Sequence, residues 1–325
     1  MSHMTYPEAI VVGFIQGITE LFPVSSLGHN VLIPALIGGS WAADLNVAAS
    51  ASPYLAFIVG MHVATAIGLL IYFWRDWVRI IAAFFSSIRE RDIATVDQKL
   101  AWMLIVATIP VGLVGVVFEH EFRVLFAKPV RAAIFLIING VILFAGERFR
   151  TKRSRQADAA LAAERTAVQG PGTGRASHAS GQRAERLAEI ESGKQADARL
   201  ATKSFGEALV IGSSQILALL AGISRDGVTM VAGMLGGLSR EDAARFAFLL
   251  ATPVILAAGV LKVPDLIQHG HGIYGQILVG SVLSGLGAYV SVRFLMKYFQ
   301  TRTLTPFAVY CVVFGVFCVI YLHFT

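Results

Sequence analysis

Residues 8–29 read EAIVVGFIQGITELFPVSSLGH and contain an apolar segment that is too short and too polar to cross a bilayer. The apolar run before Pro23 has about 15 residues, whereas a helix needs roughly 20 to span the hydrocarbon core. Glu20, inside this run, would cost several kcal/mol if it faced lipid. A short polar helix broken in mid-membrane is typical of a re-entrant hairpin that lines a protein-enclosed cavity. We therefore predict such a hairpin over residues 8–37.

A second stretch repeats this pattern. Residues 207–228 read EALVIGSSQILALLAGISRDGV and align with the first stretch without a gap at an offset of 199 residues. Eight of the twenty-two aligned positions are identical, among them the pairs Gln16/Gln215, Ser25/Ser224 and Gly28/Gly227. We interpret this as an internal repeat and predict a second re-entrant hairpin over residues 207–237.

Composition places the chain in the membrane. Of its 325 residues, 55% are hydrophobic and 15% are charged, and the mean hydropathy is +0.66. A soluble domain carries about 25% charged residues, so the composition indicates an integral membrane protein. The net charge of +6 comes from basic residues clustered in particular loops, which is typical of cytoplasmic membrane loops and not of nucleic-acid binding.

The apolar periodicity predicts six transmembrane helices, at about 54–74, 101–118, 130–146, 241–263, 274–294 and 305–323. Five Lys or Arg residues in the segment 75–99 place that segment in the cytoplasm. Counting spans from there, the two halves have opposite topology. We therefore expect an all-α integral membrane protein of six spans plus two re-entrant helical hairpins in an inverted-topology repeat, with the hairpin tips meeting near the midplane.

The repeats define three regions. Repeat one covers residues 1–146 and repeat two covers residues 207–325. Between them, residues 147–206 form an insertion with twelve Lys or Arg and the low-complexity middle QGPGTGRASHASGQ. We predict that this insertion is cytoplasmic and disordered, with helix near 157–168 and 182–192, and we assign it no chemistry.

The hairpin tips suit an anion. Ser25 or Ser26 is placed to cap the second half-helix of the first hairpin, and Ser224 has that role in the second hairpin. Two helix N-termini would then face a shared pocket and attract negative charge. Arg225 adds a fork-shaped cation, and Gly28 allows close backbone approach to a ligand. The tips therefore predict a phosphate site.

Reactive groups lie beside this site. Ser26 and His29 are three residues apart, a spacing that puts a hydroxyl and an imidazole on one helix face as a nucleophile–base pair. Gln16 and Glu20 are four apart, and their oxygens, with phosphate and water, could hold a divalent ion such as Mg²⁺. His62, alone in the first span, is interpreted as a packing or hydrogen-bonding residue.

QGITELFPVSSLGH together with AGISRDGVT resembles the bacterial undecaprenyl-diphosphatase family of the bacitracin-resistance type. That family is marked by an acidic (E/Q)xxxE motif, a PVSSxGH segment and a PGxSRSxxT segment. The resemblance covers both hairpins and all six spans and leaves out only residues 150–203. It implies hydrolysis of undecaprenyl diphosphate to undecaprenyl phosphate and phosphate. This reaction recycles the cell-wall lipid carrier in the bacterial inner membrane, with the active site opening to the outer side.

The resemblance also implies roles for the first motifs. Gln16 and Glu20 would bind a divalent cation, Mg or Ca, or polarise the diphosphate. Ser26 would be the nucleophile, although attack by His29 or by water stays open. His29 would be the base or the leaving-group acid, and Ser25 would join Gly28 in binding the substrate.

In the second motif, Ser224, Arg225 and Thr229 would hold the phosphates, with Arg225 stabilising the reacting group. The chain departs from the family pattern at Ala221, where proline is usual, and at Asp226, where serine is usual. Asp226 could orient Arg225, bind metal, or mark a changed substrate preference, and these three alternatives stay open.

Two other functional classes share features with this sequence. A transporter or flippase of an anionic lipid or solute also uses inverted repeats with broken helices, and phosphate release in detergent separates it from a hydrolase. The acid-phosphatase-like lipid phosphatases need a histidine where this chain has Val231, so we reject that class. The expected partners are a polyprenyl diphosphate lipid and the membrane, without nucleic acid, and a homodimer stays open.

Overall fold

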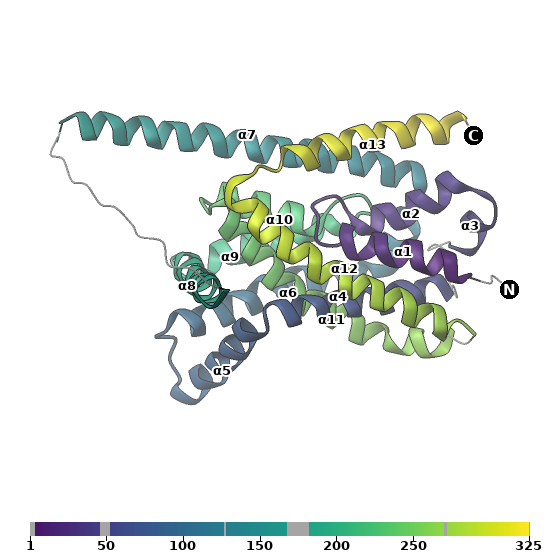
Figure 1. The fold of residues 1–325 in the computed structure, drawn as a ribbon, viewed down its shortest axis with the longest axis horizontal. Helices are drawn as coiled ribbons and strands as arrows, with labels where there is room; N and C mark the ends of the chain where they lie inside the picture. The colour runs from purple at the N-terminus through teal and green to yellow at the C-terminus, as the bar shows by residue number, and fades with distance from the viewer. Residues whose placement is uncertain (1–3, 46–52, 127, 168–181, 270–271, 325) are drawn as a thin grey trace.

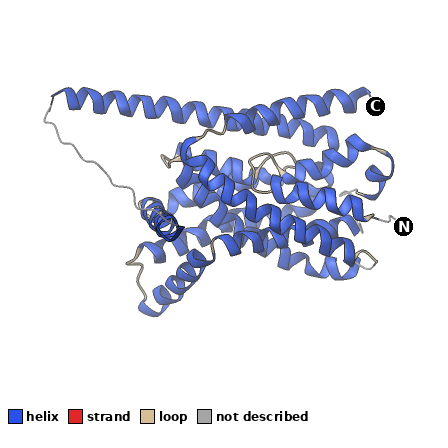
Figure 2. Cartoon of the chain, in the orientation of Figure 1, coloured by secondary structure: helices blue, strands red, loops and turns tan. Residues whose placement is uncertain are grey.

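The computed structural model describes residues 4–45, 53–126, 128–167, 182–269 and 272–324. Every regular element within these ranges is a helix (Figure 2). Six of the helices contain stretches long and apolar enough to cross a membrane, which confirms the six predicted spans. They are α4 (Pro53–Tyr72), α6 (Val96–Phe126), α7 (Pro129–Ala167), α11 (Arg240–His269), α12 (Tyr274–Thr301) and α13 (Thr305–Phe324). The chain is therefore an all-α, multi-pass membrane protein.

Two helix–break–helix units lie among the long helices (Figure 1). The first consists of α1 (Tyr6–Thr19) and α2 (Ser26–Ile37). The second consists of α9 (Phe205–Ser213), the 3₁₀ helix η1 (Ser214–Leu219) and α10 (Arg225–Leu235).

Both units start with the same device, a capping box that satisfies backbone N–H groups at the helix start. The box pairs Thr5 with Glu8 in α1 and Ser204 with Glu207 in α9, at positions that the repeat makes equivalent. Figure 1 shows α1 and α2 toward the end of the bundle that carries both termini, and α9 and α10 toward the opposite end. Entry into the bilayer from opposite faces, and with it the inverted repeat, stays a prediction, as do the domain limits.

Glycine lets α1 pack closely on α12. A β-carbon on Gly13 would lie 2.6 Å from the carbonyl oxygen of Gly280, and one on Gly17 would lie 2.5 Å from that of Ser284. Small residues at such crossings are common between membrane helices because packing replaces the hydrophobic effect there. This contact holds the end of α1, where Glu20 lies, against the interior of the bundle.

The segments predicted to be cytoplasmic are largely helical where the structure describes them. Residues 75–99 include α5 (Trp74–Glu90), and the insertion contains the end of α7 and α8 (Gln182–Leu200). Asp197 of α8 is fully buried and accepts hydrogen bonds from Arg79 of α5 and from Arg245 of α11. The helices predicted near 157–168 and 182–192 are observed as the end of α7 and as α8, and this buried charge cluster fixes α8 to the bundle. The low-complexity middle of the insertion falls largely on residues 168–181, which lie outside the described residues.

Candidate active site

The two helix breaks touch each other. The hydroxyl oxygen of Ser25 accepts the backbone N–H of Gly28 at 3.2 Å, which caps α2, and that of Gly222 at 3.1 Å. A β-carbon on Gly28 would come within 3.0 Å of the Cα of Gly222, so the contact depends on glycine. Ser25 has a φ of +68°, a conformation that costs a non-glycine residue about 1–3 kcal/mol. The expected meeting of the tips is thus observed as a direct hydrogen bond.

Asn139 of α7 joins the same two breaks from the side. Its side-chain amide donates to the carbonyl of Pro23 at 3.0 Å and accepts the N–H of Ser224 at 3.0 Å. Asn139 is fully buried. Sequence reasoning missed this residue, although a polar side chain in the middle of an apolar span is the kind of signal that marks function or polar packing.

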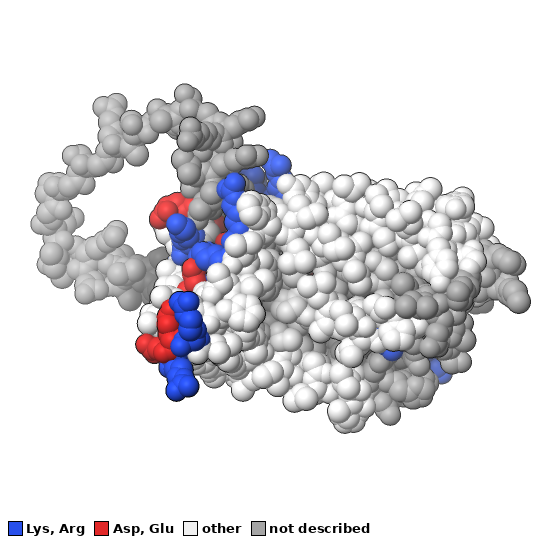
Figure 3. Space-filling model, turned by 90° about the horizontal axis from the view of Figure 1, so that it is seen from below, with Lys and Arg blue, Asp and Glu red and all other residues white. Residues whose placement is uncertain are grey.

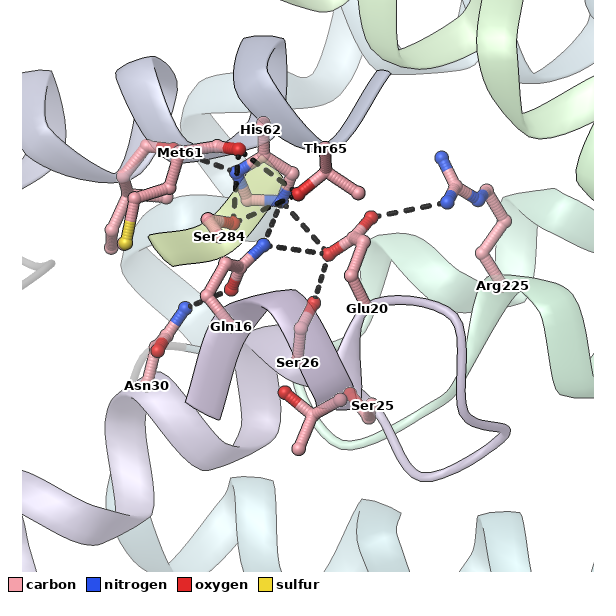
Figure 4. Close-up of polar contacts among 12 residues, drawn as sticks. Gln16, Glu20, Ser25, Ser26, Asn30, Met61, His62, Thr65, Arg225 and Ser284 are labelled. Atoms are coloured by element: carbon pink, nitrogen blue, oxygen red, sulfur yellow. Dashed lines mark hydrogen bonds and ion pairs between the residues drawn. The ribbon is translucent and has the colours of Figure 1, made fainter. Parts of the chain in front are cut away.

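Glu20 is the centre of the site (Figure 4). Its Oε1 accepts a hydrogen bond from Nη2 of Arg225 at 3.0 Å. Its Oε2 accepts hydrogen bonds from Nε2 of Gln16 at 2.8 Å and from the hydroxyl of Ser26. Three of the predicted site residues, from both halves of the chain, therefore converge on the buried carboxylate of a fourth, Glu20.

His62 belongs to this group as well. Its Nε2 lies 3.3 Å from Oε2 of Glu20 and 3.4 Å from Nε2 of Gln16. Its Nδ1 donates to the carbonyl of Ile58 at 2.9 Å, which turns Nε2 toward the carboxylate. The hydrogen-bonding role expected of His62 is observed, but the sequence did not indicate that the bond would be made inside the candidate site.

His29 does not pair with Ser26. Its Nδ1 donates to the carbonyl of Ser25 at 2.7 Å, and its Nε2 accepts the hydroxyl of Tyr310 at 2.7 Å. The ring also stacks on Phe314 of α13. Both ring nitrogens are thus engaged, and the hydroxyl of Ser26 turns to the carboxylate of Glu20, which is the stronger acceptor. The predicted pairing of Ser26 with His29 is therefore not observed, and Ser26 pairs with Glu20 instead.

The second break supplies the remaining predicted residues. Ser224 caps α10 by accepting the N–H of Gly227 at 3.1 Å, as expected. The hydroxyl of Thr229 donates to the carbonyl of Arg225 at 2.8 Å. Asp226 is 1% exposed, and its Oδ1 accepts a hydrogen bond from Nε of Arg225 at 3.3 Å. Of the three roles left open for Asp226, this contact favours orientation of Arg225.

The residues expected to bind metal lie side by side, and each makes hydrogen bonds within the protein. Oε1 of Gln16 accepts from the amide of Asn30 at 2.7 Å, while both oxygens of Glu20 accept from the groups described above. Among the described residues, no three or more His, Cys, Asp or Glu side chains gather in a way that could hold a metal ion. A cation here would therefore depend on the ligand and on water for most of its coordination.

Comparison with known proteins agrees with this arrangement. The family model described as "Bacitracin resistance protein BacA" matches residues 9–317. A protein of Mycolicibacterium paratuberculosis named undecaprenyl-diphosphatase is 56% identical over 316 residues, covering 97% of this chain and 96% of its own length. Proteins named undecaprenyl-diphosphatase 2 from Frankia alni and Burkholderia orbicola are 52% and 39% identical, and each alignment covers at least 94% of both chains. With its paired helix breaks and the Ser26–Glu20–Arg225 contact, the chain belongs to the bacitracin resistance protein BacA family.

Proposed function

We propose that this protein hydrolyses undecaprenyl diphosphate to undecaprenyl phosphate and inorganic phosphate, and so recycles the lipid carrier of cell-wall synthesis. The observation that carries the proposal is the bridge through Glu20, which binds the hydroxyl of Ser26 with one oxygen and Arg225 with the other. The names of the relatives support the same activity. The transporter alternative has no support from the comparisons.

The reaction begins at Ser26. Its Oγ attacks the terminal phosphorus, the anhydride P–O bond breaks, and undecaprenyl phosphate leaves. Glu20 takes the hydroxyl proton through the hydrogen bond to its Oε2. Water then attacks the phosphoserine, inorganic phosphate leaves, and Glu20 returns the proton to Ser26. A positioned base of this kind typically contributes 10²–10⁴-fold to the rate.

Arg225 supplies charge for the phosphates. Its side chain is only 14% exposed and is held between Glu20 and Asp226. A guanidinium suits the oxygens of a transferring phosphoryl group because it presents donors in a fixed fork. The capped starts of α2 and α10 direct further backbone N–H groups and helix dipoles toward the same place.

We also propose a divalent cation, Mg or Ca, at Gln16 and Glu20. The residue types fit, because carboxylate and amide oxygens are the ligands that hard cations prefer. In this structure Nε2 of Gln16 faces Oε2 of Glu20 at 2.8 Å and its Oε1 faces Asn30, so the Gln16 amide would turn to bring its oxygen to the ion. When bound with the substrate, the ion would neutralise negative charge on the diphosphate. The measurement is phosphate release before and after chelation, with restoration by added Mg²⁺ or Ca²⁺.

The proposed location is the bacterial inner membrane, with the site opening to the outer side. This is supported by the position of α1 and α2 at the end of the bundle opposite the basic end of α7 (Figure 1). The prenyl tail would lie between helices or in the bilayer. The oligomeric state stays open between a monomer and a homodimer, and light scattering in detergent distinguishes the two.

The proposed function is tested with purified protein in detergent, where no membrane separates two compartments and transport therefore cannot occur. We expect phosphate release from undecaprenyl diphosphate, and a loss of at least about 100-fold in Ser26→Ala. Ser213→Ala is the matched control, because its exposed hydroxyl bonds only to its own helix at Leu209. No phosphate release by the wild-type protein, or full activity of Ser26→Ala, would overturn the proposal.

A further inference from the structure

Helix α5 carries an exposed apolar stripe at the cytoplasmic end of the bundle. The stripe consists of Trp74, Val78, Ile81, Phe85 and Ile88, whose spacing alternates between four and three residues. That spacing places them on one face of the helix. Each of the five is about half exposed or more, with Phe85 at 63%. The helix is not among those that are long and apolar enough to cross a membrane.

The other faces of α5 contact the rest of the protein, so the stripe faces outward. Ile80 and Ser87 are buried. Arg79 donates to Asp97 of α6 at 2.6 Å and also pairs with the buried Asp197 of α8. Figure 1 shows α5 leaving the bundle at the end from which α7 projects. At this end Lys and Arg residues gather, interspersed with Asp and Glu (Figure 3).

The stripe continues into a groove between α5, α6 and α11. The groove has a volume of about 660 Å³, and its lining includes Ile81 of the stripe, residues of α6 from Ala101 to Val117, and Leu261 of α11. Among the residues that line it, Thr108 is the one with a polar side-chain oxygen. The sixteen helical steps from Ala101 to Val117 rise about 24 Å, most of the roughly 30 Å hydrocarbon core. The groove is therefore long and apolar enough for a hydrocarbon chain.

A smaller pocket of about 510 Å³ adjoins the cytoplasmic end of this groove. Its walls include Ile88 of the stripe, Trp102, which follows Ala101 in sequence, and the exposed Arg91 and Asp92. The indole N–H of Trp102 donates to the hydroxyl of Ser87 at 2.9 Å, which fixes the ring beside Arg91. Tryptophan at this level is typical of a membrane–water interface.

We propose that this surface binds an anionic glycerophospholipid of the cytoplasmic leaflet, with one acyl chain in the groove and the phosphate at Arg91. Charge complementarity selects this occupant. The segment 75–99 carries five Lys or Arg against four Asp or Glu, and an excess of basic residues beside a membrane attracts anionic lipid. The continuity of the stripe, the groove and the pocket at Arg91 matches a molecule that is apolar along its length and carries a phosphate at one end. This site is separate from the proposed active site and does not depend on it.

The test uses three of the four tryptophans, which lie on this surface: Trp74, Trp77 and Trp102. The full chain carrying Trp41→Phe is reconstituted in vesicles that contain brominated phosphatidylglycerol or brominated phosphatidylcholine, and quenching of tryptophan fluorescence gives their relative affinity. We expect phosphatidylglycerol to bind about fivefold more tightly, which is the contribution of one basic residue near an anionic surface.

Two variants distinguish binding of the lipid headgroup from binding of the acyl chain. Arg91→Gln should bring the preference close to one, whereas Arg302→Gln, which removes the same charge elsewhere on the predicted cytoplasmic face, should keep it. Gly112→Leu should reduce quenching by both lipids, because a β-carbon at Gly112 meets no atom within 4 Å and the larger side chain fills the groove without an internal clash.

Four results would overturn the proposal. They are equal quenching by the two lipids, an equal loss of preference in Arg91→Gln and Arg302→Gln, relief of quenching by added undecaprenyl phosphate, and quenching that falls as protein density rises. The third would assign the groove to a prenyl chain, and the fourth would assign the stripe to a second copy of the protein. Diphosphatase activity is measured separately, so failure of the proposed function leaves this test intact.

Discussion

Oε1 of Glu20 lies 3.0 Å from Nη2 of Arg225, although 205 residues separate the two in sequence. The pair joins the end of α1 to the start of α10, and it is largely shielded from solvent. The second oxygen of the same carboxylate binds the hydroxyl of Ser26. Glu20 therefore links the proposed nucleophile to the proposed phosphate-binding cation.

Replacing Glu20 by Gln should abolish most activity. The amide cannot accept the proton of Ser26, and it removes one of the two buried carboxylates that pair with Arg225, leaving Asp226. We expect kcat for phosphate release to fall by about 10²–10⁴-fold. Glu8→Gln is the matched control, since glutamine also completes a capping box. Comparable activity in Glu20→Gln and wild type would show that another group accepts the proton.

Tyr310→Phe tests whether the role of His29 is structural and not chemical. The substitution removes the hydroxyl that binds Nε2 of His29 and leaves the stacked rings in place. Loss of one such hydrogen bond should lower the free energy of unfolding by about 1–3 kcal/mol. Thermal unfolding in detergent measures it.

Activity measurements on His29→Gln complete this test. If His29 is structural, its variant should retain more activity than Ser26→Ala. If His29→Gln is as inactive as Ser26→Ala while Tyr310→Phe is unchanged in both stability and activity, His29 takes part in the chemistry.

Asn139→Leu should destabilise the meeting of the two breaks. The change leaves the carbonyl of Pro23 and the N–H of Ser224 buried without the partner that now satisfies them. Each such group costs about 1–3 kcal/mol, so a clear fall in the unfolding midpoint is expected. Thr108→Val is the control, because its hydroxyl bonds to Leu104 of its own helix. Equal midpoints for the two variants would contradict this role.

Gly222→Ala should prevent normal folding. Gly222 has a φ of +112°, and an added β-carbon would lie 2.3 Å from the carbonyl oxygen of Ala132. Gly38→Ala provides the comparison, since Gly38 also has a positive φ, of +71°, but its β-carbon would meet no atom within 4 Å. We expect Gly38→Ala to cost about 1–3 kcal/mol of backbone strain and no steric clash. Size-exclusion profiles and unfolding midpoints distinguish the two variants.

The parts of the structure that could be predicted are those that depend on local sequence patterns. The spans follow from hydropathy, and the breaks follow from Pro23 and Gly222 together with the caps Ser25 and Ser224. These signals are local because a cap or a break acts within one helical turn. The partner of His29 was not predictable, since Tyr310 lies 281 residues away and spacing along one helix suggested Ser26 instead. The metal, the nucleophile and the topology of the repeats stay predictions.

By itself, the sequence determined that the chain crosses a membrane six times and belongs to the BacA family, because hydropathy and motif spacing are written along the chain. Only the tertiary structure decided that Ser26 binds Glu20, that His62 joins them, and that Asn139 holds the two breaks together. These contacts depend on how separate helices pack and turn their side chains. Packing brings together residues that lie far apart in sequence, and no local pattern records which of several neighbouring polar groups will meet.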